Sequence, residues 1–175
     1  MATLRIPDKH VTLQDPLAVR QFLDLRGIVN ERWSADRDLP SSATNEQVLA
    51  AYDYLLKPLM KKYRYQTTDV IAVDGQTPNL EGIREKFLRE HTHSEDEVRV
   101  FVEGQGLFWF HKEEPDDEVF ALLCEQGDLI SVPANTKHWF DLGDAPKVRA
   151  IRIFTDQAGW VPHYTNSGID RRYRW

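Results

Sequence analysis

Hydrophobic and polar positions in the first 65 residues follow the period of helices in two stretches. The first stretch begins at Asp15 and Pro16, which are suited to a helix cap and a first helical turn, and it stops at Gly27. Its apolar positions are Leu17, Val19, Phe22, Leu23 and Leu25. This pattern predicts a short amphipathic helix.

The second helical stretch begins near Thr44 or Asn45 and runs to about Tyr63, and we expect Pro58 to kink it. Lysines near its end suit the negative pole of the helix dipole. Its apolar stripe consists of Val48, Leu49, Tyr52, Leu55, Leu56 and Leu59. The polar segment 31–42, between the two helices, is predicted to be a loop.

From about Val70 the pattern changes to short apolar runs separated by Gly, Pro, Asp and Asn. The runs are 70–73, 98–102, 107–110, 119–124, 129–132 and 148–154. Six or more short strands without intervening helices predict an antiparallel sandwich or barrel. Within this region, we expect segment 104–106 to form a tight hairpin and the acidic segment 113–118 to form a solvated loop.

Composition narrows the class of protein. The chain has 175 residues, a net charge of −6 and one cysteine, Cys124. This length suits a single domain, in which we expect residues 1–65 to be helical, residues 66–165 to form a barrel and residues 166–175 to form a tail. The negative charge argues against nucleic-acid binding, and no apolar run approaches the roughly 20 residues that span a membrane.

The same features predict where the protein works and in what state. The lone thiol cannot form an internal disulfide, and the first residues do not resemble a signal peptide, so we expect a cytoplasmic protein. We expect a monomer because no long apolar stripe is left without an assigned partner.

One segment, 90–99, contains several side chains that could bind a metal. Residues two apart in a strand project to the same face, so His91 and His93 would lie side by side, and Glu97 shares that parity with Arg99. If a turn at 94–96 brings the second strand back beside the first, Glu97 completes a set of two histidines and one carboxylate. That set is typical of Fe(II) oxygenases, because it leaves positions open for substrate and dioxygen.

The alternative is that the two histidines lie on a solvated surface. His138 argues against this alternative, because it opens a strand after a Pro-Ala-Asn turn in the same strand-rich region. A third imidazole makes a metal centre the better interpretation.

Together the two segments resemble the bipartite signature of the cupin superfamily. The chain departs from this signature at Asn135, where Gly is expected, and at Leu142, where Asn is expected. The matching positions are His91, His93, Glu97 and Gly104 in the first half, and Gly127, Pro133 and His138 in the second. The resemblance implies a mainly β fold with an α-helical N-terminal part, built on a cupin barrel (a double-stranded β-helix or jelly roll).

A longer set of segments resembles the acireductone dioxygenase family of the methionine salvage pathway. The segments are 87–99, 102–106, 124–133, 138–141, 149–154 and 159–162, within roughly residues 70–165. This resemblance implies one Fe(II) or Ni(II) per chain, held by His91, His93, Glu97 and His138, with two positions left for the substrate. The sequence does not choose between the two metals, because the same ligands serve both.

The family's activity is the oxidation of 1,2-dihydroxy-3-keto-5-methylthiopent-1-ene by dioxygen. With iron the products are formate and 4-methylthio-2-oxobutanoate. With nickel they are formate, carbon monoxide and 3-methylthiopropanoate. The partners that the resemblance implies are therefore a small molecule, the acireductone, and dioxygen.

Two arginines are candidates for stabilising the anionic enediol. Arg99 shares strand parity with Glu97 and is expected to face the same interior; the alternative is a surface ion pair, for example with Glu103. Arg152 lies on an otherwise apolar strand face, where a charge must be paired or functional. The resemblance favours a catalytic role for Arg152, and an ion pair that closes the barrel is the alternative.

The methylthio tail of the substrate needs an apolar wall. The resemblance assigns this role to Phe87, Phe140 and Trp160, for each of which ordinary core packing is the alternative. Three other candidates receive no role: His111 and His163 are predicted to be surface or loop residues, and Cys124 a small buried hydrophobe.

Two other functions stay open on the sequence alone. One is a different metal-dependent cupin dioxygenase or isomerase, since three histidines and a carboxylate also suit zinc. The other is a non-catalytic cupin that binds a small ligand through its metal. The extended run 90–99 and segment 159–162 favour the dioxygenase.

Overall fold

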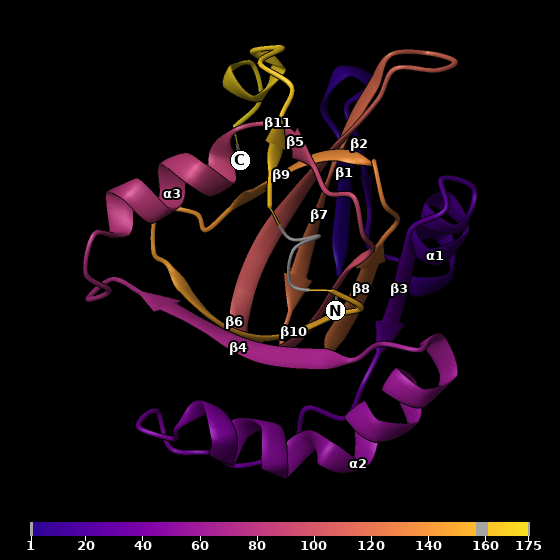
Figure 1. The fold of residues 1–175 in the computed structure, drawn as a ribbon. Coiled ribbons are helices and arrows are strands. Elements are labelled where there is room, and N and C mark those ends of the chain that lie inside the picture. The colour runs from indigo at the N-terminus through magenta and orange to yellow at the C-terminus, as the bar shows by residue number, and fades with distance from the viewer. Residues whose placement is uncertain (1, 157–160, 175) are drawn as a thin grey trace.

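A computed structural model describes residues 2–156 and 161–174, whose strands curl into an antiparallel barrel with helices outside it (Figure 1). The long strand β6 (Glu97–Lys112) belongs to two faces of this barrel. Its first half pairs with β8 (Asp128–Val132) and β10 (Lys147–Phe154), and its second half with β7 (Glu118–Glu125) and β9 (Lys137–Asp141). The predicted mainly β barrel is confirmed.

Short strands extend both faces. On one face, β4 (Thr67–Asp74) pairs with β10, and β3 (Val29–Arg32) pairs with β8. On the other, β1 (Thr3–Ile6) pairs with β7 and β2 (Val11–Leu13) with β1, while β5 (His91–Thr92) pairs with β9 and β11 (His163–Tyr164). Strands β1, β2 and β3 lie in the region predicted to be helical, and β3 overlaps the predicted loop.

Both predicted helices are present. Helix α1 (Pro16–Asp24) is capped by the Asp15 side chain, which accepts a hydrogen bond from the backbone N–H of Ala18. Helix α2 (Asn45–Tyr63) starts with a capping box formed by Thr44 and Gln47, and it continues through Pro58. Its stripe packs against the outside of the barrel through buried Val48, Tyr52 and Leu56.

Helix α3 (Leu80–Leu88) was not predicted and intervenes between β4 and β5. Its apolar residues Leu80, Ile83 and Phe87 lie on one face and pack, partly buried, against the core, and sequence reasoning passed over this short stripe. In the described part of the chain, the short 3₁₀ helices η1 (Pro7–Lys9) and η3 (Ile169–Arg171) lie near its two ends. Among the described residues, no helix is both long and apolar enough to cross a membrane.

Strand β6 is buried on both of its faces except near its middle, which explains its two apolar runs at 98–102 and 107–110. Inside the barrel it contributes Phe101, Phe108 and Phe110. Outside, Val98, Val100 and Val102 face α2, whereas Leu107 and Trp109 are covered by Ile169 and Tyr173 from the C-terminal segment. Helix α2 and the C-terminal segment therefore hold β6 rigidly at the centre of the fold.

The prediction of a hairpin at 104–106 is wrong, because β6 runs through these residues without turning. Gly104 has a φ of +70°, and a Cβ there would lie 1.9 Å from the carbonyl oxygen of Lys147. A Cβ at Gly106 would lie 2.1 Å from the Phe140 ring. Glycine serves here for close approach, where β6 passes from one face to the other.

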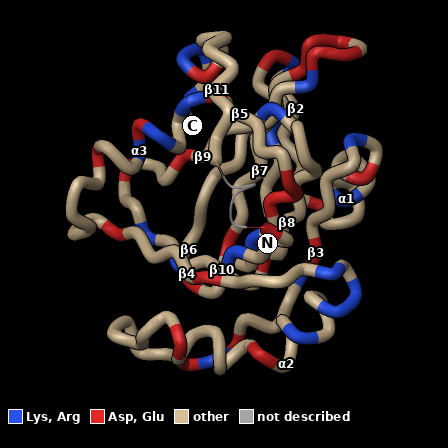
Figure 2. The backbone as a smooth tube through the Cα atoms, in the orientation of Figure 1, with Lys and Arg blue, Asp and Glu red and all other residues tan. Residues whose placement is uncertain are grey.

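The acidic hairpin between β6 and β7 projects from the barrel, with acidic residues at its tip (Figure 2). Residues 113–117 are exposed, which confirms the predicted solvated loop. Glu118 differs, because its side chain is 9% exposed and pairs with Lys9 at 2.8 Å and with Arg26 at 2.5 Å. It joins β7 to η1 and to the end of α1.

We predict that Gly104→Ala destabilises the protein far more than Gly143→Ala. Both residues have positive φ, at +70° and +69°, but a Cβ at Gly143 meets nothing within 4 Å. The strain of φ alone costs about 1 kcal/mol, whereas the added clash at Gly104 should bring the loss to about 3 kcal/mol or more. Urea unfolding measures both values, and equal losses would contradict this role of Gly104.

We also predict that Glu118→Gln lowers the unfolding free energy by about 1 kcal/mol at neutral pH. Burial opposes ionisation of Glu118, but hydrogen bonds and charges from Lys9 and Arg26 outweigh it and lower its pKa. The stabilisation is therefore complete above the ordinary value of 4.5 and is lost as pH falls through the lower folded value. Unfolding at several pH values tests this; exposed Asp116→Asn is the control, and a pH-independent loss would refute the charge argument.

Candidate metal centre

Four buried side chains meet inside the barrel: His91, His93, Glu97 and His138. One ligand atom from each lies within 4.8 Å of the others. The Nε2 atoms of His138 and His93 lie 2.9 and 3.3 Å from one Glu97 carboxylate oxygen. The structure thus brings together all four ligands predicted from the sequence.

The four candidate ligands come from both faces of the barrel. Strand β5 does not lie directly beside β6, as the simple turn at 94–96 would require, because β9 pairs with both strands. His91 is opposite His138 in the β5–β9 pair. Glu97 reaches the centre from the other face, where it pairs with Val132 of β8. The four groups are neighbours only because the barrel closes.

Backbone hydrogen bonds hold the two halves of the motif together. The N–H of Asn135 donates to the carbonyl of His93 at 2.8 Å, and that of Ala134 donates to the Asp96 carboxylate at 2.9 Å. Asn135 has a φ of +61°, so it takes the left-handed conformation expected of the Gly that it replaces. This departure from the cupin signature leaves the turn intact.

Two of the imidazoles are oriented for metal binding by their outer nitrogens. Nδ1 of His91 lies 2.6 Å from the carbonyl oxygen of Arg89, and Nδ1 of His138 lies 2.8 Å from that of Thr136. Donation from Nδ1 leaves the Nε2 lone pair for the centre. Burial, aided by His138, lowers the pKa of His91 to about 3, so this imidazole is neutral as a ligand requires.

The carboxylate of Glu97 is ionised although it is only 1% exposed. Burial acts to raise its pKa, but the Arg99 charge and hydrogen bonds from His138 and His93 hold it well below the usual range. Nε of Arg99 lies 2.5 Å from Glu97 Oε1. Imidazoles and one carboxylate form a donor set that suits borderline divalent metals such as Fe(II) and Ni(II).

Arg99 faces the interior, as its parity with Glu97 predicts, and is 4% exposed. Its guanidinium carbon lies 4.6 Å from the centre of the Phe140 ring, 5.3 Å from that of Phe108 and 5.8 Å from that of Phe87. Burial lowers the pKa of Arg99 despite the opposing charge of Glu97. The alternative partner Glu103 instead pairs with Lys147 and Arg149.

Arg152 lies directly opposite Arg99 in the β6–β10 pair. Its Nε lies 2.7 Å from Asp69 Oδ1, and its Nη2 contacts the other carboxylate oxygen. The Arg152 side chain is 26% exposed. Its ion pair with Asp69 joins β10 to β4 at the edge of the barrel interior, where solvent reaches it.

The three aromatic residues predicted to line the pocket differ in where they lie. Phe140 is buried, and its ring centre lies 6.2 Å from that of Phe87, which α3 presents to β9. Trp160 lies outside the described residues. Phe101 and Phe108 also pack against Phe140, so the wall beside Arg99 is more extensive than the sequence suggested.

The prediction that His111 is a surface residue is wrong. It is 7% exposed, and its Nδ1 lies 2.6 Å from a carboxylate oxygen of buried Glu90. His111 ends the apolar run of β6 and Glu90 precedes His91, and these positions were the signal that sequence reasoning passed over. As predicted, His163 is exposed and Cys124 is buried. Burial raises the pKa of the Cys124 thiol.

Comparisons with known proteins identify the same family that the sequence segments resemble. Residues 7–162 match the model of the ARD/ARD' family. The chain is 51% identical over 174 residues to an acireductone dioxygenase from Picosynechococcus, covering 99% of this chain and 98% of that one. An acireductone dioxygenase from Klebsiella oxytoca is 50% identical over 155 residues, with coverages of 89% and 84%.

A solved structure from the same family has a similar fold. Acireductone dioxygenase from Bacillus anthracis, with a cadmium ion in its active centre, superposes with a TM-score of 0.86 at 36% identity, covering 94% of this chain and 98% of that one. The buried three-histidine, one-carboxylate centre, the barrel around it and these matches over nearly the whole chain agree: the chain belongs to the acireductone dioxygenase family.

Proposed function

We propose that His91, His93, Glu97 and His138 hold one Fe(II) or Ni(II), and that the protein uses it as an acireductone dioxygenase. The observation that carries this proposal is the convergence of four buried ligand atoms within 4.8 Å in a member of this family. Its substrate is 1,2-dihydroxy-3-keto-5-methylthiopent-1-ene, which reacts with dioxygen.

When held by His91, His93, Glu97 and His138, the metal would supply Lewis-acid chemistry to the enediol. The chain supplies the surroundings. The buried guanidinium of Arg99 offers N–H donors and positive charge to the anionic enediol in a region shielded from water. We assign Arg152, one strand away, a second catalytic role beside the enediol, with its guanidinium oriented by the ion pair with Asp69.

The apolar end of the substrate needs a different surface. Phe87 and Phe140 flank Arg99 and would contact the methylthio group, and we assign Trp160 to the same wall. A rigid aromatic wall beside a charged clamp would hold the substrate in one orientation.

The metal would decide the products. With iron we expect formate and 4-methylthio-2-oxobutanoate. With nickel we expect formate, carbon monoxide and 3-methylthiopropanoate.

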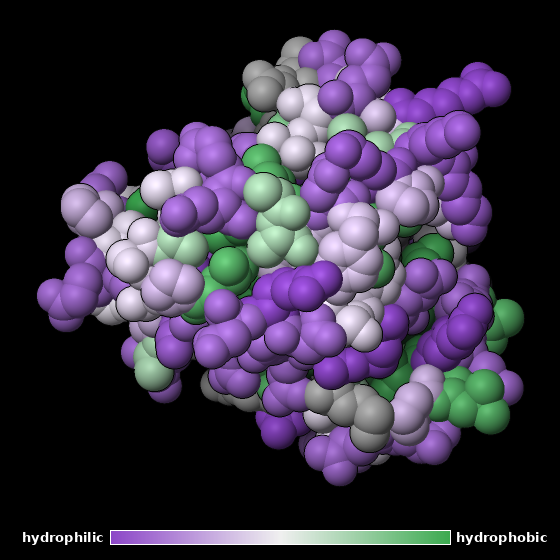
Figure 3. Space-filling view, turned by 90° about the horizontal axis from the view of Figure 1, so that it is seen from below, coloured by the Kyte–Doolittle hydropathy of each residue, from purple (hydrophilic) through white to green (hydrophobic). Residues whose placement is uncertain are grey.

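We further propose a monomer that works in the cytoplasm. Hydrophilic residues cover much of the face seen in Figure 3, where apolar residues form separate groups. The free thiol of Cys124 is buried and suits a reducing compartment.

We predict that metal-free protein regains acireductone oxidation when it is loaded with iron or nickel, and that His93→Ala neither retains metal nor oxidises the substrate. Anaerobically prepared acireductone is mixed with oxygenated buffer, and its absorbance and products are followed. Failure of both metals to exceed spontaneous oxidation would contradict the dioxygenase. Metal retention without turnover would favour a non-catalytic cupin.

We predict that Arg99→Lys keeps its metal but loses about 10²- to 10³-fold in kcat/KM, because the ammonium keeps a positive charge beside Glu97 while the planar guanidinium donors are lost. The matched control is Arg149→Lys on β10, since Arg149 contacts the backbone of Pro40 and Ser41 outside the barrel. Metal content and steady-state kinetics measure both variants. Full activity in Arg99→Lys, or an equal loss in Arg149→Lys, would refute the assigned role.

A further inference from the structure

Strand β5, which carries His91, has little backbone support. It consists of two residues and pairs with β9 at one position and with β11 at two. By contrast, Glu97 belongs to a strand of 16 residues and His138 to one of five. A metal ligand must be held to within about half an ångström, so β5 needs support from side chains.

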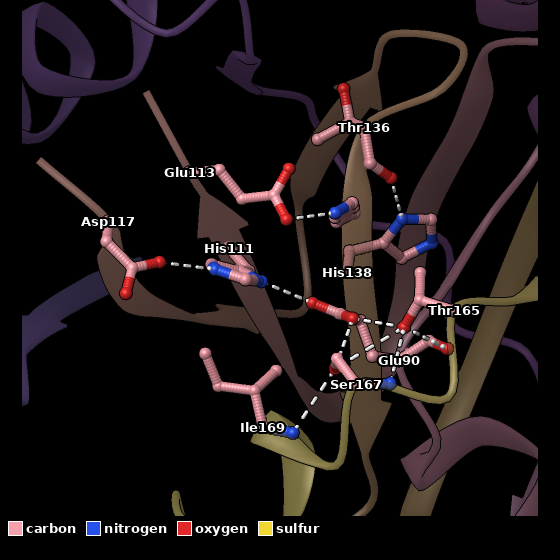
Figure 4. A network of polar contacts seen from close by, with 10 residues as sticks. Glu90, His111, Glu113, Asp117, Thr136, His138, Thr165, Ser167 and Ile169 are labelled. Carbon is pink, nitrogen blue, oxygen red and sulfur yellow. Dashed lines mark hydrogen bonds and ion pairs between the residues drawn. The ribbon is translucent and has the colours of Figure 1, made fainter. Parts of the chain in front are cut away.

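Glu90, the residue before His91, supplies such contacts on the opposite side of β5. It is 2% exposed, and its side chain points toward His111 and the C-terminal segment (Figure 4). Successive residues of an extended chain alternate in direction, so Glu90 and His91 lie on opposite sides of it. His111 Nδ1 and Ser167 Oγ each lie 2.6 Å from its carboxylate, and Thr165 Oγ1 also donates to it. The Glu90 backbone carbonyl accepts a hydrogen bond from the N–H of Thr165.

The partner histidine is itself fixed on both sides. Nε2 of His111 lies 2.8 Å from Asp117 Oδ1, so each ring nitrogen faces a carboxylate. Removing one partner would leave a buried polar group unsatisfied, which costs more than the hydrogen bond itself contributes. The set formed by Glu90, His111, Thr165 and Ser167 is therefore held in one arrangement.

This set links the strands that carry the metal ligands. In the sheet, β9 lies between β5 and β6, and its His138 is paired with both His91 and Phe110. Because His111 follows Phe110 on β6, the contact from Glu90 to His111 spans β9. It fixes β5 relative to the strand on which Glu97 lies.

From this geometry we infer that Glu90 is a positioning residue for His91: with His111 and segment 165–167, it holds the short strand β5 at the distance that metal binding requires. The inference rests on the metal centre proposed above. It assigns no contact between Glu90 and the metal or the substrate. Groups that orient ligands from outside typically change metal affinity by about 10- to 100-fold when they are removed.

The test measures metal release separately from turnover. The full-length protein is loaded with Ni(II), and release into excess chelator is followed together with the ligand-field spectrum and the melting temperature. Glu90→Gln and His111→Gln should each release Ni(II) about 10- to 100-fold faster. The double variant should release it no more than about threefold faster than the faster single variant, because the two residues act as one unit.

Asp128→Asn is the matched control. Asp128 is a fully buried carboxylate that accepts hydrogen bonds from Arg32 and from the backbone of Glu125, away from the centre. Its loss should lower the melting temperature yet leave Ni(II) release within about twofold of the unmodified protein. If Glu90→Gln behaves in the same way, Glu90 is merely structural and the inference is overturned.

Ser167→Ala keeps the inference testable should Glu90→Gln fail to fold. Ser167 is exposed, and the substitution removes one hydrogen bond to Glu90. We expect release to be about threefold faster, and unchanged release would overturn the inference. Failure of the dioxygenase proposal looks different, since unmodified protein would then bind Ni(II) without oxidising acireductone.

Discussion

The ion pair between Glu97 and Arg99 is the interaction on which the rest of the site depends. A carboxylate that is 1% exposed would ordinarily take up a proton, and a protonated carboxyl group is a poor metal ligand. Arg99, held 2.5 Å away, keeps it ionised. Since the two residues are two apart on one strand, a single strand face supplies both the ligand and its counter-charge. The same guanidinium is the group that we propose contacts the anionic substrate.

This arrangement requires a rigid and dry support, which β6 provides. Its inner residues pack in the barrel, while its outer residues are covered by α2 along the first half and by the C-terminal segment along the second. Gly104 allows the strand to pass between the faces. Strand β5 has only two residues, and the buried side chain of Glu90 beside it contacts His111 and Ser167. The positioning role proposed for Glu90 would link packing to metal coordination at this short strand.

The four side chains that meet at the candidate metal centre could be predicted because three of them are close together in the sequence. His91, His93 and Glu97 lie within seven positions, and the turn that leads to His138 has its own signature. What the sequence could not provide was the pairing of strands: β9 lies between β5 and β6 because of contacts between distant segments. The buried position of His111 was missed for a related reason, since a local pattern does not reveal that β6 is covered on both faces.

The central claim is that these four side chains form one metal site, and a crystal structure of the nickel-loaded protein tests it most directly. Diffraction data collected above and below the nickel absorption edge would locate the metal. The account predicts one anomalous peak per chain, about 2.1 Å from ligand atoms of His91, His93, Glu97 and His138. A peak elsewhere, or a centre without one of these four residues, would contradict it.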